Sequence, residues 1–373
     1  MKARRLRTLI TRSLRRQGFL IRSGQVALPP DLTKDKVRSL HAEAVRHRID
    51  MSRARLRQRE TALLAQLASG AEVVPERITP RLIEVKRGSF EELLFRYSCL
   101  HWSIPLSSGY GRRLRFLVMD DYTGKLLGLI GLGDPVFSLG PRDEWIGWTR
   151  NARRRRLQNV LDAFVLGAVP PYSFLLGGKL VAMLAASNEV RAAFRRKYGG
   201  RRSLIRGATT DGRLAMITTS SALGPSSIYN RLQYNSTLLY QRVGFTSGSG
   251  DFHFSNGLYS TLSAFAHRNC TPTAKRAQWG SGFRNRREVI KKCLSAVGLS
   301  SEWIYHGVQR ELFVIPLAKN TRPFLQGRQS RLFWLNYSQE DLFTFFRSRW
   351  LMPRSERDRR FRDWHPVEWR LWP

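Results

Sequence analysis

The sequence is poor in cysteine and has no long hydrophobic run. Its three cysteines, Cys99, Cys270 and Cys293, lie far apart. This number and spacing supply neither a disulfide framework nor a zinc ligand set, and they suit a reducing compartment. The most apolar stretch, residues 174–187, is interrupted by two glycines and a lysine, whereas a membrane-spanning helix needs roughly 20 apolar residues. The basic N-terminus is followed by no apolar segment of the kind that a signal peptide needs. We therefore expect a cytoplasmic protein that does not associate with membranes.

Acidic residues are also scarce. The chain of 373 residues has 28 Asp and Glu against 64 Lys and Arg, a formal net charge of +36. Such a charge opposes a compact state unless a polyanion neutralises it, which excludes a self-contained metabolic enzyme as the default interpretation. Hydrophobic residues still make up 42%, with 20 Phe, 11 Tyr and 10 Trp, and this excludes a wholly disordered tail. The composition predicts a folded protein with an anionic partner, and we expect that partner to be a nucleic acid.

The charge and hydrophobic pattern divide the chain into three predicted parts. Residues 1–75 form a basic helical arm, with seventeen Lys or Arg and five Asp or Glu in the first 60 positions. Residues 76–265 form the core, and residues 266–373 form an extension that packs on the core and ends in an Arg- and Trp-rich tail. A run of charge is often only the solvated face of a helix. Because the excess in the arm is almost unopposed, we favour nucleic-acid contact.

The core has the pattern of an α+β fold. Two apolar runs, Leu114–Met119 and Leu126–Leu132, flank a turn at Asp120–Gly124 and predict a hairpin. A strand at Ala163–Val169 is followed by a glycine turn and a helix from Leu180. Further apolar runs and helical spacings predict strands at 215–219, 243–246 and 311–317 and helices at 227–232 and 287–297. We expect a mixed sheet with flanking helices.

The order of these elements resembles the acetyltransferase fold of the GNAT superfamily. The residues that carry the resemblance are Val169-Pro170-Pro171-Tyr172, Leu176-Gly177-Gly178-Lys179-Leu180 and Tyr240-Gln241-Arg242-Val243-Gly244-Phe245. The resemblance implies a GNAT-like core in which Gly177, Gly178 and Lys179 at a helix N-terminus hold the pyrophosphate of an acyl-CoA-like donor. The family's leading basic residue is missing from residues 173–178. The alternative role for the two glycines is close packing of the helix on the sheet.

A longer resemblance covers nearly everything from residue 112 to the end. The chain is similar to the DruA proteins of Druantia anti-phage systems in the strings LLGLIGLGDPVFSLGPRDEWIGW, GGKLVAMLAASNEVR, MITTSSALGPSSIYNRL, VGFTSGSGDFHFS, YHGVQRELFVIPLAKNTR and FRSRWLMPRS. This similarity implies a bacterial genome-defence or mobile-element setting, commonly beside a helicase-like partner, with no catalytic residues to carry over. Basic GNAT-like proteins are also similar in element order to the phage Mom proteins, which modify adenine in DNA.

Clusters of Lys and Arg are the candidate nucleic-acid contacts. They are Arg12, Arg15, Arg16, Arg153, Arg154, Arg155, Arg156, Arg195, Arg196, Lys197, Arg201, Arg202, Arg347 and Arg349. Guanidinium groups neutralise phosphates, and the aromatic residues interleaved with arginine in the last forty positions could stack on unpaired bases. The alternative for those aromatics is a clasp that packs the tail onto the body.

Asp251 and His253 are the candidate catalytic pair. They alternate with Phe252 and Phe254, so on a strand both polar side chains would face one side. A carboxylate beside an imidazole raises the basicity of the imidazole, which suits a general base or a pair that hydrogen-bonds a base edge. The same alternation is also typical of any half-buried strand.

Five acidic residues raise the possibility of a metal-dependent nuclease. They are Asp120, Asp121, Asp134, Asp143 and Glu144. Carboxylates of this kind could hold a divalent ion for phosphodiester hydrolysis, or they could pair with neighbouring arginines. No metal ligand set is assigned from the sequence.

The leading hypothesis is a DNA-binding component of a bacterial anti-phage defence or mobile-element system. The alternatives are an acyl-CoA-type transferase that modifies nucleic acid, a metal-dependent nuclease, and a subunit without activity of its own that loads a helicase.

Overall fold

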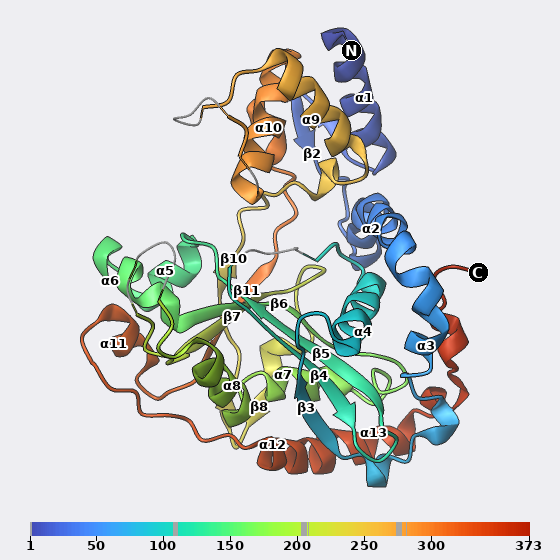
Figure 1. Cartoon of the computed structure of the whole chain (residues 1–373), viewed down its shortest axis with the longest axis vertical. Helices are drawn as coiled ribbons and strands as arrows, with labels where there is room; N and C mark the ends of the chain where they lie inside the picture. Colours follow the sequence, from blue (N-terminus) through green and yellow to red (C-terminus); the bar gives the residue numbers. More distant parts are fainter. Residues whose placement is uncertain (1, 107–110, 203–206, 208, 274–277, 281) are drawn as a thin grey trace.

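A central mixed sheet carries most of the molecule, and a smaller helical module lies beyond one end of it (Figure 1). The computed structural model describes residues 2–106, 111–202, 207, 209–273, 278–280 and 282–373. Within these ranges no helix has both the length and the apolar character needed to cross a membrane.

The sheet has seven strands in the order β10-β11-β7-β6-β5-β4-β3. Their bounds are β3 Pro80–Glu84, β4 Arg113–Asp120, β5 Lys125–Gly133, β6 Val160–Ala168, β7 Met216–Ser220, β10 Gln241–Phe245 and β11 Glu311–Pro316. Strands β6 and β7 run parallel, and every other neighbouring pair is antiparallel. The predicted hairpin is confirmed, with Asp120 opposite Lys125 and Gly124 at a φ of +69° in the turn. The predicted strands at 163–169, 215–219, 243–246 and 311–317 are confirmed with shifted ends.

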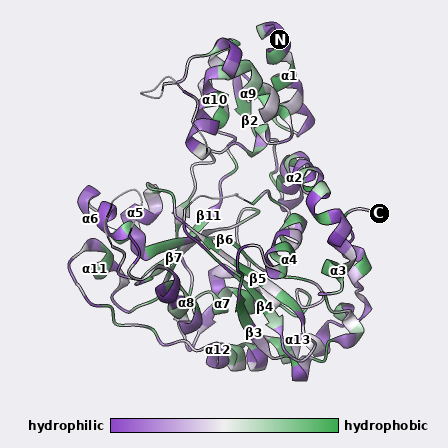
Figure 2. Ribbon diagram, in the orientation of Figure 1, coloured by the Kyte–Doolittle hydropathy of each residue, from purple (hydrophilic) through white to green (hydrophobic). Residues whose placement is uncertain are grey.

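Helices cover both faces of the sheet. One face packs against α7 (Gly177–Leu184), α8 (Asn188–Tyr198) and α12 (Gln339–Phe346), in a core that includes Phe116, Ile130 and Phe194. The other face packs against α2 (Lys34–Leu56), α3 (Glu60–Leu64) and α4 (Phe90–Ser98), in a core that includes Leu117, Leu129 and Val165. The hydropathy colouring shows the central strands as apolar and the outer helices as largely polar (Figure 2).

The helical module joins the N-terminus to a later part of the chain. It contains α1 (Ala3–Arg16), the hairpin β1 (Leu20–Arg22) and β2 (Gln25–Ala27), α9 (Leu258–Asn269) and α10 (Phe283–Ala296). Leu6, Ile10 and Leu14 of α1 are fully buried in one cluster with Leu262 and Ile290. The first helix is therefore basic on its outside and part of a packed core on its inside.

The sheet contains strands from both sides of the predicted boundary between core and extension. Strand β11, from the segment assigned to the extension, lies between β7 and β10. The remaining elements pack around the sheet, with short two-stranded pairing between β8 and β9. Their bounds are α5 Gly140–Ile146, α6 Arg150–Arg156, β8 Gln233–Tyr234, β9 Thr237–Leu238, α11 Thr321–Gln326 and α13 Met352–Arg357.

The tryptophans at the C-terminus act as a clasp. Trp364 and Trp372 are buried in the core beside α3 and α4. The rings of Trp369 and His101 are stacked with centroids 4.0 Å apart, and the Tyr97 hydroxyl donates to the Trp369 carbonyl over 2.6 Å. Of the two roles considered for these aromatics, packing of the tail onto the body is the one that they have in this fold.

Candidate nucleic-acid interface

Asp251 and His253 do not lie on a strand, so the shared face that a strand would give them is absent. Residues Phe252–Phe254 form a 3-10 turn, in which the Phe254 amide donates to the Asp251 carbonyl over 3.0 Å. The Asp251 carboxylate pairs with Arg286. The His253 ring is fully buried and its Nε2 lies 2.8 Å from the Trp303 carbonyl oxygen.

Asp251 and His253 thus have separate partners, and among the described residues no hydrogen bond joins them to each other. Burial lowers the pKa of His253 to about 4, so its imidazole is neutral at physiological pH. Packing against Phe19 and Phe254 encloses the ring. Catalysis by this pair stays a prediction, and the geometry gives it no substrate access.

Gly177 and Gly178 lie, as predicted, at the start of a helix. A Cβ on Gly177 would come within 2.7 Å of the Tyr172 carbonyl oxygen and 2.9 Å of the Ala168 Cβ, so α7 approaches β6 more closely than a side chain would permit. The Gly177 amide already donates to that same carbonyl. The Lys179 Nζ lies 4.6 Å from the centre of the Trp350 ring. Close packing explains the first glycine, and donor binding by these residues stays a prediction.

The arginine run on α6 divides into two kinds of side chain. Arg153 donates to the Asp143 carboxylate over 2.8 Å and lies over the Phe137 ring, while Arg156 lies over the Phe324 ring at 4.2 Å. Arg154 and Arg155 are exposed, with no partner among the described residues. Only half of this run is therefore free to meet phosphate.

The other predicted clusters lie on different parts of the surface. Arg12, Arg15 and Arg16 are exposed on α1 in the helical module, where Arg16 pairs with Glu43. Arg195, Arg196 and Lys197 end α8, and the last two pair with Glu84. Arg201 and Arg202 follow α8 and are exposed, as are Arg347 and Arg349 in a π-helical turn at residues 347–351 near the C-terminus. These clusters come from α1, from the end of α8 with the residues after it, and from the turn before α13.

Four of the five acidic residues considered for a metal site have structural partners, and the Asp120 carboxylate accepts from the Tyr172 hydroxyl over 2.8 Å. Asp121 pairs with Arg81, Asp134 with Arg112, and Asp143 with Arg142 and Arg153. Across the described ranges, no three His, Cys, Asp or Glu side chains are grouped as a metal site would require.

A cavity of about 850 Å³ between α2, α4 and β4 gathers basic side chains that the sequence does not group. We call it the basic groove. The cationic residues that line it are Arg48, Arg55, Arg87, Arg96, Arg113, Arg115 and Lys197. Lys197 is the one member of the predicted set that lies here. Among the described residues that line the basic groove, Glu92 has the one carboxylate.

Both oxygens of the Glu92 carboxylate accept hydrogen bonds within the groove. Its Oε1 accepts from Arg96 over 3.0 Å and from Arg115 over 2.9 Å, while Oε2 accepts from the Gly88 amide over 2.8 Å. Burial alone would raise the pKa of Glu92, but these hydrogen bonds outweigh it and lower the pKa to about 2. Glu92 is therefore ionised at physiological pH and organises two of the groove's arginines.

Of the remaining cations Lys197 pairs with Glu84 over 2.9 Å, whereas Arg48, Arg55, Arg87 and Arg113 have no ion pair among the described residues. Burial lowers the pKa of Arg48, and the nearby charge of Arg96 lowers it further. Burial also lowers the pKa of Arg113, and Arg115 and Arg96 act in the same direction. Burial is the main cause of both shifts, and the neighbouring guanidinium groups add to it. An incoming phosphate would offset this like-charge repulsion.

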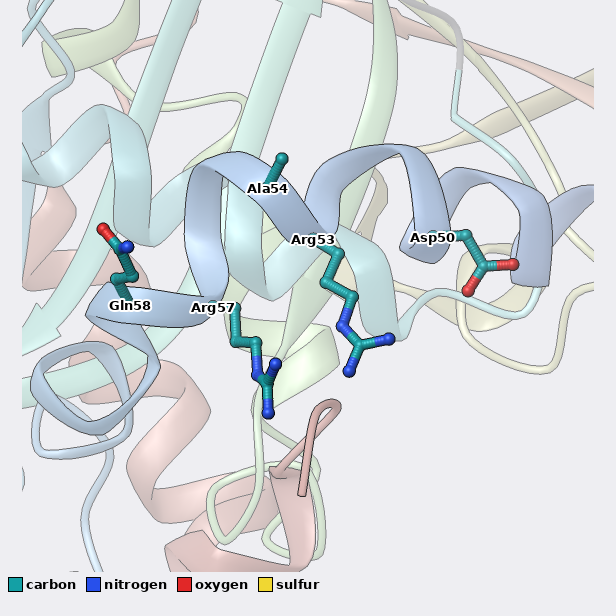
Figure 3. A pocket seen from close by; sticks show the side chains of 5 residues that line it. All are labelled: Asp50, Arg53, Ala54, Arg57 and Gln58. Atoms are coloured by element: carbon teal, nitrogen blue, oxygen red, sulfur yellow. The ribbon is translucent and has the colours of Figure 1, made fainter.

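A second, smaller hollow of about 620 Å³ lies along another side of α2. Arg53 and Arg57 project from the same side of the helix, close to the C-terminal tail (Figure 3). Arg57 lies 3.4 Å from the Pro373 carbonyl oxygen. The basic residues at the end of α2 therefore serve two surfaces, the basic groove through Arg55 and this hollow through Arg53.

Sequence reasoning missed most of the groove because its cations come from segments that are far apart in the chain. A weak signal existed on α2, where Arg48 and Arg55 are seven positions apart and so share a helical face. On β4, Arg113 and Arg115 alternate with the buried Leu114 and Phe116 and so point away from that core. Nothing in the sequence indicates that these two faces meet.

Comparison with known proteins gives the family. The family model for Druantia protein DruA matches residues 31–327. The chain is also 38% identical over 365 residues to the Druantia protein DruA of Escherichia coli (strain UMEA 4076-1), an alignment that covers 98% of this chain and 90% of that protein. The chain belongs to the DruA family. No solved structure matches it.

The DruA family match includes every element that forms the basic groove, from α2 to α8. It leaves out α1 with Arg12, Arg15 and Arg16, and also the turn with Arg347 and Arg349. The groove is therefore part of the family's matched region, whereas two of the predicted basic clusters lie outside it.

Proposed function

We propose that this protein is the nucleic-acid-binding component of a bacterial anti-phage defence system, with DNA as its ligand. Membership in the DruA family supports the setting, because the family is named for a Druantia protein. The setting also favours a helicase-like protein as a partner.

One observation carries the binding function. Of the seven cationic side chains that line the basic groove, Arg96 and Arg115 share Glu92 and Lys197 pairs with Glu84. The other four have no ion pair among the described residues. In a chain with a formal net charge of +36, such a cavity holds uncompensated positive charge that a phosphate backbone would neutralise with release of its counterions. Further exposed arginines on α1, α6 and α8 would add contacts that position the ligand without reading its sequence.

We further propose that the core is GNAT-like. The support is the order of its elements: the β4–β5 hairpin, β6, the helix α7 that opens at Gly177, and β7 parallel to β6. Fold order alone does not define an activity. Because packing accounts for Gly177, the proposed function includes binding but no acyl transfer.

The test is equilibrium binding of the full chain to a fluorescein-labelled DNA of 20 nucleotides, single-stranded or duplex, at increasing salt. If six to ten phosphates are neutralised, affinity should fall by roughly 10³ to 10⁵ between 50 and 200 mM salt. The same measurement with an RNA of equal sequence tests the preference for DNA. Absence of binding to every one of these ligands at low salt, or an affinity that salt does not change, would contradict the proposal.

A further inference from the structure

The shape of the basic groove selects the form of its ligand. Resting on the nucleic-acid binding proposed above, we infer that the groove takes an unpaired DNA strand and does not take a duplex. Three features lead to this inference: cations on facing walls, an apolar lining between them, and a length that exceeds one nucleotide.

The cations enter the groove from separate elements. Arg48 and Arg55 come from α2, Arg96 from α4, and Arg113 and Arg115 from β4. Positive charge from several walls can surround one phosphodiester backbone. In a duplex the two backbones lie on the outside of stacked base pairs, so only one side of each backbone would reach a cavity of this kind.

Apolar side chains lie between the basic walls. Phe95, Leu100 and Leu106 line the groove but are buried, so the half-buried ring of Phe164 is the one of these four that a base can reach. Its centre lies 6.4 Å from that of the Phe95 ring. The Arg115 guanidinium lies 5.6 Å from the centre of the Phe95 ring. An unpaired strand offers base faces to such a surface, whereas a duplex keeps its base faces stacked inside. Phosphate and base contacts are thus available together only to the unpaired form.

The groove is also longer than a single phosphate needs. Arg48 and Arg55 are seven residues apart on α2, which corresponds to two turns and about 10.5 Å along the helix axis. The charges of a nucleic-acid strand repeat about every 3.4 Å in B form, so this span meets more than one of them. The arginines of α2 therefore favour a chain-like polyanion over a mononucleotide.

The experiment compares two double variants of the full-length protein that lose the same charge from neighbouring sites. R55Q/R87Q removes two exposed cations of the groove, and neither has a partner among the described residues. R53Q/R59Q removes two exposed arginines that do not line the groove, at the end of α2 and just after it, and is the matched control. The probes are labelled dT20, a labelled duplex of 20 base pairs and ATP as competitor.

We expect the wild type to bind dT20 at least tenfold more tightly than the duplex, with no displacement by millimolar ATP. R55Q/R87Q should lower dT20 affinity at least tenfold and reduce the slope of log affinity against log salt by about 1.4, at about 0.7 per phosphate contact on single strands. R53Q/R59Q should change the affinity less than threefold. Thermal melting of both variants checks that the fold is retained.

The remaining outcomes overturn the inference in distinguishable ways. Equal losses in both variants would mean diffuse attraction, and tighter binding of the duplex would mean a duplex site; in both cases the proposed DNA binding stands and the strand-specific groove does not. Displacement by ATP would make the groove a nucleotide pocket. Failure of the wild type to bind any DNA at low salt would remove the proposed function itself.

Discussion

The arginine run on α6 and the basic groove show two ways in which a chain can carry positive charge. Arg153–Arg156 are adjacent in the sequence, yet Arg153 and Arg156 are occupied by Asp143 and by aromatic rings. The groove draws its cations from residues 48 to 197 and includes one paired carboxylate. Arginines that are adjacent in the sequence thus meet different partners in the fold, whereas cations from separate segments of the chain are brought to one cavity.

The largest expected effect is a loss of stability at acid pH. It comes from three buried histidines that are neutral in the fold, whereas the side chains of the groove are charged. Burial lowers the pKa of His41 and His253 to about 4 and of His306 to about 2. Folding therefore favours the neutral rings, and the stability they contribute is complete above about pH 6.5 and is lost as pH falls towards 4. Urea unfolding from pH 7.5 to 4.5 should show a loss of up to about 4 kcal/mol per pH unit for the three together.

A flat stability profile over that range would show that these rings titrate as they do in the unfolded chain.

The second test asks whether α1, another segment with charge dense along the chain, is an independent arm. Ile10 is fully buried against the helical module, so Ile10→Ala should destabilise the protein by about 2–5 kcal/mol through lost burial and a residual cavity. Arg12→Ala on the exposed side of the same helix should stay within about 0.5 kcal/mol. Unfolding followed by circular dichroism gives both values. Equally small losses of stability in the two variants would indicate that α1 is an arm detached from the helical module.

The third test removes Glu92, the one carboxylate among the described residues that line the groove. Glu92→Gln leaves Arg96 and Arg115 without their anionic partner, so stability should fall by about 3 kcal/mol. The same substitution makes the groove more positive, so DNA affinity at low salt should rise. The two measurements, urea unfolding and DNA titration, are expected to move in opposite directions. A fall in both would assign Glu92 a purely structural role.

The smallest expected effect divides the α6 run itself. R153Q/R156Q removes side chains packed on Phe137 and Phe324 and should cost about 1–2 kcal/mol of stability. R154Q/R155Q removes two exposed, unpartnered cations of the described surface and should cost less than about 0.5 kcal/mol. Thermal melts of the two variants, which lose equal charge, provide the comparison. Identical melting temperatures would mean that the fold treats all four arginines alike.

Local patterns predicted the elements whose residues decide their own conformation. The hairpin at 113–133 was predictable because two apolar runs flank an Asp-Asp-Tyr-Thr-Gly turn, and α7 because apolar spacing follows two glycines. The alternation at Asp251–Phe254 misled, because Phe252, His253 and Phe254 are all buried in one turn before α9. Alternation in sequence indicates two faces only when the backbone is extended.

The candidate site was largely beyond sequence reasoning. Of the groove's cations, only Lys197 belonged to the clusters predicted as nucleic-acid contacts. Arg48, Arg87 and Arg113 are brought together by long-range packing of α2 and α4 on the sheet, which has no local signature. Membership in the DruA family was predictable, because it rests on long strings of residues and needs no knowledge of how they fold.

The assembly of the helical module sets an order of events at the ribosome. The Asn256 side chain donates to the Ser13 hydroxyl over 2.8 Å, across 243 positions of the chain. At 5–20 residues per second, α1 emerges roughly 12–50 s before the segment that will cover its leucines has been synthesised. During that interval the nascent chain displays a cationic amphipathic helix beside ribosomal RNA, so shielding of its apolar face becomes a task for the cell's folding machinery.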